Sequence, residues 1–204
     1  MTLETTNTAP VVGRLMKLRI VSDLHGEHDA SHGNFYDLPT APNEEETVFV
    51  LAGDITSMDD LPYILEDCSA RFLAVIFVFG NHEYYGKDID AEIRFKIPAN
   101  VHILKNGAVT IGAVTFLGAT LWGGMDGEDP LLMMDVVSKV TDLQTGKTST
   151  KIADYDAIRK GDRYLLPQDT VGMFKASKKF LAEEMGKRSQ EKVVVVTHHA
   201  PSYQ

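Results

Sequence analysis

The sequence predicts an α/β fold in which parallel and antiparallel strands are mixed. Six short apolar runs rich in β-branched residues recur along the chain, and segments with helical spacing separate some of them. The composition supports a globular domain, since 44% of the 204 residues are hydrophobic and 24% are charged, unlike a disordered or membrane chain. This length suits one domain with a substantial core.

The predicted strands follow directly from the apolar runs. In chain order they cover residues 17–21, 47–52, 73–79, 101–104, 114–117 and 193–197. Several runs are nearly continuous instead of alternating, which predicts strands that are buried on both faces. Gly107 and Gly112 bracket short alternating segments, and these predict an antiparallel hairpin. The fold is therefore not expected to be purely doubly wound.

Two helices are predicted from apolar residues at helical spacing. Residues 59–70 carry four apolar residues on one helical face and complete a βαβ unit between the second and third runs. Residues 167–185 begin with a proline that suits a first helical turn, and Gly186 is expected to end that helix. Residues 122–166 lose the regular pattern, so we expect an excursion with some helix there.

The first fifteen residues are polar and unpatterned, and we expect a flexible tail at 1–15 before a domain at 16–204. No run approaches the roughly eighteen apolar residues of a membrane helix, and the chain does not open with a secretory signal pattern. The single cysteine, Cys68, excludes an internal disulfide and a cysteine-cluster metal site, and it suits a reducing compartment. We therefore expect a cytoplasmic protein without a membrane partner.

The charge balance argues against one class of partner. The formal net charge is −9, from 20 basic and 29 acidic residues, which disfavours binding to duplex nucleic acid through phosphate contacts. Seven histidines accompany these carboxylates, and together they are the donor types of a divalent metal site.

Polar residues follow four of the apolar runs at the point where each run ends. They are Asp23 and His25, then Asp54, then Asn81, His82 and Glu83, then His198 and His199. Because open α/β sheets bind ligands at the carboxyl ends of their strands, we expect these side chains to share one edge. Turn or capping chemistry explains each motif alone. It does not explain their joint occurrence at successive strand ends.

Together these motifs resemble those of the calcineurin-like metallophosphoesterase superfamily. Its pattern of D-x-H, G-D, G-N-H-[DE] and a later His is matched by Asp23-Leu24-His25, Gly53-Asp54, Gly80-Asn81-His82-Glu83 and His198. The opening MKLRIVSDLH, the segment DYDAIR at 154–159 and the ending THHAPS are similar to small bacterial and phage members. The resemblance implies a four-layer αββα sandwich of mixed sheets.

The resemblance also implies a site for two divalent metal ions. Asp54 would bridge both ions and count as a catalytic residue. Asp23 and His25 would complete one metal site, and Asn81 and His198 would complete the other. A mixed set of oxygen and imidazole donors favours Mn, Fe or Zn.

Three further residues have implied roles outside the ligand set. His82 would donate a proton to the leaving group or hold the phosphate, as the second catalytic residue. Glu83 would orient His82, and His199 would lie behind the ligands or contact a lid. For Glu83 and His199 a purely structural role is equally open.

The implied activity is hydrolysis of a phosphate mono- or diester by attack of a hydroxide that bridges the two ions. The acidic composition favours a small phosphoester or a single-stranded nucleotide as substrate over long duplex DNA. The alternative function is a non-catalytic metal-binding or regulatory relative that keeps the fold without turnover.

The sequence departs from the family pattern at its C-terminal end, where the final G-H-x-H motif is absent and the chain ends at Gln204. We therefore expect a sandwich that is incomplete at that end. Three explanations are open. The chain could be a fragment, it could be naturally short and catalytically weakened, or another subunit of a homo-oligomer could supply the missing ligands.

Overall fold

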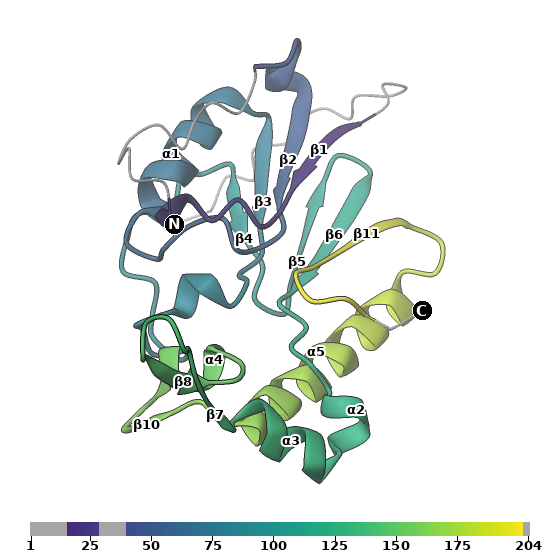
Figure 1. The fold of residues 1–204 in the computed structure, drawn as a ribbon. Coiled ribbons are helices and arrows are strands. Elements are labelled where there is room, and N and C mark those ends of the chain that lie inside the picture. The colour runs from purple at the N-terminus through teal and green to yellow at the C-terminus, as the bar shows by residue number, and fades with distance from the viewer. Residues whose placement is uncertain (1–15, 29–39, 202–204) are drawn as a thin grey trace.

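Two facing β-sheets form the centre of the protein in the computed structural model, which describes residues 16–28 and 40–201 (Figure 1). The first sheet is entirely parallel, with strand order β1-β2-β3-β4. Its strands are β1 (Lys17–Val21), β2 (Thr47–Leu51), β3 (Ala74–Phe77) and β4 (Val101–Ile103). The predicted flexible tail at 1–15 lies outside the described residues.

The second sheet has three strands and contains the predicted hairpin. Its strands are β5 (Gly107–Ile111), β6 (Val114–Ala119) and β11 (Lys192–Thr197), in the order β11-β6-β5. β5 pairs with β6 in antiparallel register, as the flanking glycines predict, whereas β11 runs parallel to β6. The structure is therefore mixed, as expected.

Two long helices cover the outer faces of the sheets (Figure 1): α1 (Leu61–Arg71) and α5 (Pro167–Lys187). Ile64 of α1 packs in one buried cluster with Phe49 of β2, and Leu181 of α5 packs in another with Leu117 of β6. A third cluster, which includes Val50 of β2, joins the two sheets. The order of layers is helix, sheet, sheet, helix, which confirms the αββα expectation. No helix among the described residues is long and apolar enough to span a membrane.

The start of α5 follows its local sequence. Pro167 occupies the first turn, where a missing N–H costs no hydrogen bond. The Asp169 carboxylate accepts a hydrogen bond from the Leu166 N–H at 2.9 Å, which caps that turn. The helix ends at Lys187, two residues beyond the predicted end and past Gly186.

The expectation of strands buried on both faces is right for central strands and wrong for edge strands. Every residue of β2 and β3 is buried, because α1 covers one face of the sheet and the second sheet covers the other. β11 is a continuous apolar run at a sheet edge, and its Val195 is 42% exposed. A continuous apolar run therefore does not distinguish an edge strand from a central one.

Residues 122–166 form most of a lobe beside the sandwich, in the lower part of Figure 1. Its elements are α2 (Met125–Glu128), α3 (Pro130–Val136), β7 (Lys139–Thr141), β8 (Thr148–Thr150), α4 (Asp154–Ala157), β9 (Arg159–Lys160) and β10 (Arg163–Tyr164). The backbone N–H of Gly86 donates to the Ala157 carbonyl at 2.8 Å, and the buried Tyr155 belongs to the same core cluster as β2. The lobe is thus fixed to the sandwich through α4.

Candidate functional site

The loops that follow β1 and β2 are hydrogen bonded to one another. The Asp23 N–H donates to the Gly53 carbonyl at 3.0 Å, and the His25 N–H donates to the Asp54 carbonyl at 3.1 Å. These bonds continue the parallel pairing of the two strands past their carboxyl ends. The D-x-H and G-D motifs therefore lie side by side.

The backbone of these loops adopts an unusual conformation at three predicted metal ligands. The φ angles of Asp23, His25 and Asp54 are 53°, 49° and 53°, in the left-handed region that residues with side chains rarely adopt. Such conformations persist where surrounding contacts impose them, and they cluster at functional sites. The strain favours a functional role for these loops.

The glycines of the G-D and G-N motifs allow three strand ends to approach closely. A Cβ atom on Gly53 would lie 2.6 Å from Nδ1 of His198 and 2.7 Å from the backbone nitrogen of Gly80. A Cβ atom on Gly80 would collide with the Asp54 carboxylate. Any larger residue at either position would push the loops apart, so the motif requires glycine for steric reasons.

The Asp54 carboxylate lies at the centre of the cluster, with its side chain 5% exposed. Its Oδ1 accepts a hydrogen bond from the His82 N–H at 2.9 Å. Its Oδ2 lies 3.5 Å from Nε2 of His198 and 4.0 Å from Nε2 of both His25 and His82. Burial acts to raise the pKa of Asp54, but the bonds from His198 and the His82 amide outweigh it and hold the pKa below its ordinary value. Asp54 is therefore an ionised carboxylate faced by three imidazoles.

His198 connects the second sheet to this cluster. Its Nδ1 lies 3.0 Å from the Ala52 carbonyl, and its Nε2 lies 3.2 Å from Oδ1 of Asn81. Burial acts to lower the pKa of His198, but the hydrogen bond and charge of Asp54, together with the Ala52 carbonyl and Asp23, outweigh it and raise the pKa overall. Because His198 directly follows β11, the packing of the two sheets brings it to the ends of β1, β2 and β3.

His199 points toward a different part of the molecule. Its Nδ1 lies 3.2 Å from the Thr120 carbonyl, and its ring is centred 5.3 Å from that of Trp122. Burial and the neighbouring His198 lower its pKa. His199 thus packs at the boundary between the sandwich and the lobe.

Among the residues that the structure describes, two groups of donor atoms lie close enough together to hold metal ions, with ligand atoms within 4.8 Å of one another. One is Asp23, Asp54 and His198, and the other is His25, Glu27 and His82. The first group joins three predicted ligands. The second places His25 beside His82 and adds Glu27, which belongs to none of the sequence motifs. The mixture of carboxylate and imidazole donors fits a divalent transition metal.

Glu27 contacts two imidazoles with one carboxylate oxygen. Its Oε1 lies 2.8 Å from Nδ1 of His82 and 3.3 Å from Nδ1 of His25. Burial acts to raise the pKa of Glu27, but hydrogen bonds from its own backbone and from both imidazoles lower it. With both Nδ1 atoms facing Glu27, both Nε2 atoms are directed toward Asp54. The only sequence signal for this role is the position of Glu27 two residues after His25. In the structure Glu27 lies in the short helix Gly26–His28.

Glu83 makes the contacts of a structural residue, which is one of the two roles that its motif leaves open. Its fully buried carboxylate accepts hydrogen bonds from the backbone N–H groups of Gly80, Asp54 and Ile55 at 2.7, 3.1 and 2.7 Å. It therefore holds the loop after β2 to the loop after β3, whereas the carboxylate that contacts the His82 ring belongs to Glu27. Burial raises the pKa of Glu83.

Replacing Glu83 should destabilise the whole site. Glu83→Ala leaves three buried N–H groups without their acceptor, and each costs about 1–3 kcal/mol. We expect the free energy of unfolding, measured by urea denaturation, to fall by about 3 kcal/mol or more. The exposed Glu183→Ala on α5 is the matched control and should change it by less than about 0.5 kcal/mol. Equal stability of the two variants would contradict this role.

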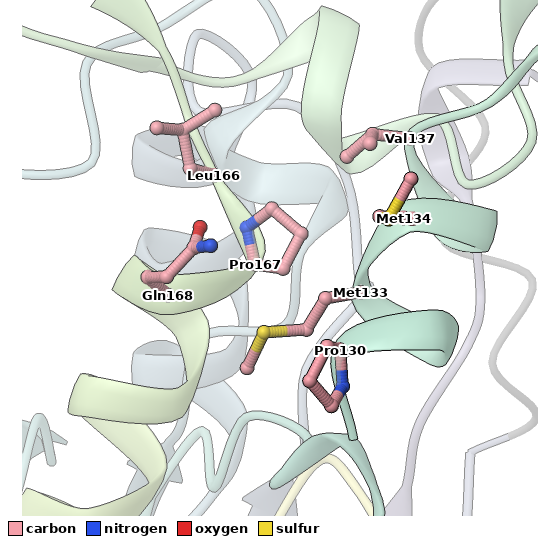
Figure 2. A pocket seen from close by; sticks show the side chains of 7 residues that line it. All are labelled: Pro130, Met133, Met134, Val137, Leu166, Pro167 and Gln168. Carbon is pink, nitrogen blue, oxygen red and sulfur yellow. The ribbon is translucent and has the colours of Figure 1, made fainter. Parts of the chain in front are cut away.

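The lobe carries an apolar cavity of about 360 Å³ between α3 and the start of α5 (Figure 2). Its lining residues are Pro130, Met133, Met134, Val137, Leu166, Pro167 and Gln168. No predicted metal ligand lines it, so the cavity is separate from the charged cluster. Methionine side chains adapt to ligands of varied shape.

Comparison with known proteins identifies the family and the fold of the chain. The family model of the calcineurin-like phosphoesterases matches residues 16–204. The solved structure of phosphopantetheinyl hydrolase (PptH) from Mycobacterium tuberculosis superposes with a TM-score of 0.58 and 18% sequence identity, covering 90% of this chain and 68% of that chain. At this identity the likeness concerns the fold alone. No curated protein matches the chain. Because the family match spans nearly the whole sequence, the chain belongs to the calcineurin-like phosphoesterase family.

Proposed function

We propose that the chain hydrolyses a phosphate mono- or diester with the help of two divalent metal ions. The observation that supports this most directly is the buried, ionised Asp54, which faces imidazoles from three separate segments. A carboxylate has two oxygens and can be shared by two ions. Family membership supports a metal-dependent phosphoesterase in general, and the residue roles below are our proposal.

The proposed ligands fall into two sets that share Asp54. Asp23 and His25 would hold one ion, and Asn81 and His198 would hold the other. When bound, such ions neutralise charge on the phosphate and lower the pKa of water so that it can attack at neutral pH. The donor types favour Mn, Fe or Zn over an all-oxygen magnesium site.

His82 is the proposed proton donor to the leaving oxygen. Its backbone N–H donates a hydrogen bond to Asp54, and its Nδ1 is hydrogen bonded to Glu27. Its ring stacks on Tyr85 with centroids 4.3 Å apart. These three contacts fix the imidazole and leave Nε2 directed into the cluster, where a phosphate ester would bind.

The contact between Glu27 and two imidazoles yields a testable prediction. Glu27→Ala removes the acceptor for both Nδ1 atoms, so kcat/KM for bis-p-nitrophenyl phosphate should fall by about 10- to 100-fold. Glu27→Gln keeps an acceptor oxygen, so its kcat/KM should lie between those of Glu27→Ala and the unmodified chain. The exposed Glu45→Ala is the control. Unchanged kinetics in Glu27→Ala would show that this carboxylate does not orient the site.

The substrate class is proposed from charge. The net charge of −9 supports a small phosphoester or a single-stranded nucleotide over duplex DNA. A cytoplasmic location and a homo-oligomer that adds ligands from a second subunit are compatible with the same proposal. The alternative function is a metal-binding relative without turnover, which the two donor groups would equally support.

Hydrolysis of model esters separates these functions. Purified chain is assayed with bis-p-nitrophenyl phosphate and p-nitrophenyl phosphate, with Mn²⁺ and with an excess of chelator. Manganese-dependent release of p-nitrophenolate supports the phosphoesterase. Bound manganese without release of product supports the non-catalytic alternative instead.

A further inference from the structure

The side chain of Asn81 is held from outside the cluster by a residue of the lobe. Its Nδ2 donates to Oδ1 of Asp154 at 2.9 Å and to the hydroxyl of Tyr85 at 3.2 Å. That hydroxyl donates in turn to the same Asp154 oxygen at 2.8 Å. Asp154 begins α4 and is 8% exposed. A partly buried triangle of hydrogen bonds thus joins the lobe to a proposed metal ligand.

The triangle determines which end of the amide faces the cluster. An amide carries one acceptor oxygen and one donor NH₂ group, and a carboxylate can only accept. Since the NH₂ group of Asn81 is held by Asp154, its Oδ1 points the opposite way, where it lies 3.2 Å from Nε2 of His198. A reversed amide would present N–H bonds, which cannot coordinate a metal ion.

We propose that Asp154 is a positioning residue. It presents the Asn81 oxygen to the metal ion that Asn81 and His198 would hold, which we call the second ion. This inference rests on the proposed function. A negatively charged acceptor on the amide nitrogen also polarises the amide and strengthens its oxygen as a ligand. Asp154 acts through Asn81 and does not itself join the ligand set.

The same helix also contacts α5. The hydroxyls of Tyr155 and Thr170 lie 3.1 Å apart, and Thr170 donates to the Pro167 carbonyl at 2.8 Å. Pro167 lines the apolar cavity. The orientation of Asn81 therefore depends on how the lobe packs, and not only on the loops at the strand ends.

Isothermal titration of Mn²⁺ into the full chain tests this role without an assay of turnover. For Asp154→Ala we expect the first ion to bind as in the unmodified chain and the second to bind about 10- to 100-fold more weakly. Asp154→Asn keeps an acceptor oxygen and should restore most of that affinity. Hydrolysis by Asp154→Ala should recover at saturating Mn²⁺.

Asp156→Ala is the matched control, because Asp156 lies on the same helix but accepts from the Thr150 N–H at 2.6 Å and pairs with Lys139. It should leave both affinities unchanged. If Asp154→Ala fails to fold, Tyr85→Phe, which keeps the ring and removes one side of the triangle, should still weaken the second ion. The inference would be overturned if Asp154→Ala and Asp156→Ala bound the second ion equally well. If Asp154→Ala does not fold, an unchanged affinity of Tyr85→Phe for the second ion would overturn it.

Asp54→Ala distinguishes this result from failure of the proposed function. In the same titration it should abolish binding of both ions. If it does not, the ions bind elsewhere and the proposed function fails, whatever Asp154 does. If Asp54→Ala abolishes binding while Asp154→Ala changes nothing, the function stands and only the positioning role is wrong.

Discussion

Asp54→Asn should reduce manganese-dependent hydrolysis of bis-p-nitrophenyl phosphate by about a thousandfold or more. Loss of the shared carboxylate removes one ligand from each proposed site, and metal ions stabilise transition-state charge by several kcal/mol, where each 1.4 kcal/mol is about tenfold in rate. The Asp54 carboxylate also faces His25, His82 and His198. The neutral asparagine side chain of the variant lacks the negative charge that these imidazoles surround.

Two controls separate this effect from unfolding. Asp67→Asn changes a partly exposed carboxylate on α1 and should leave kcat/KM within about twofold, because surface substitutions rarely disturb a structure. The circular dichroism spectrum of Asp54→Asn should match that of the unmodified chain. Folded Asp54→Asn with undiminished turnover would rule out the proposed site.

His82→Ala should produce the second largest loss, and its size should depend on the leaving group. General acid catalysis contributes about 10²- to 10⁴-fold. The p-nitrophenolate ion departs readily without a proton, whereas an alkoxide does not. We therefore expect the larger loss with an alkyl phosphoester and a smaller loss with the p-nitrophenyl esters, measured as kcat/KM for both substrates.

The comparison of the two substrates decides the role of His82. Equal losses on both would assign His82 to phosphate binding instead of proton donation. Activity that is unchanged on both would remove it from the site altogether. His102→Ala serves as the histidine control, because that residue lies on β4 and its pKa is lowered by burial alone.

The sequence is informative where one local pattern is strong. The central strands β2 and β3 are close to the predicted runs, because continuous β-branched apolar residues suit a strand covered on both faces. α5 begins at the predicted Pro167, since proline is favoured in the first turn. The strand-end motifs also predict the cluster around Asp54, because parallel strands bring their carboxyl ends to one edge.

Other features depend on contacts that no local pattern encodes. Asp154 lies 73 residues from Asn81 in the sequence, and only the folded lobe brings them together. Glu27 reaches both imidazoles because of the backbone path after His25, which the motif does not specify. The motif leaves open whether Glu83 orients His82 or has a structural role, and only the fold shows that its carboxylate accepts from backbone N–H groups.

The most direct test of the central claim is the number of metal ions that the strand-end cluster holds. The full chain and Asp54→Ala are dialysed side by side against Mn²⁺, and the metal in each is measured by mass spectrometry. We predict two ions per chain for the unmodified protein and none for the variant. The same manganese content in both proteins, or none in either, would contradict a metal site centred on Asp54.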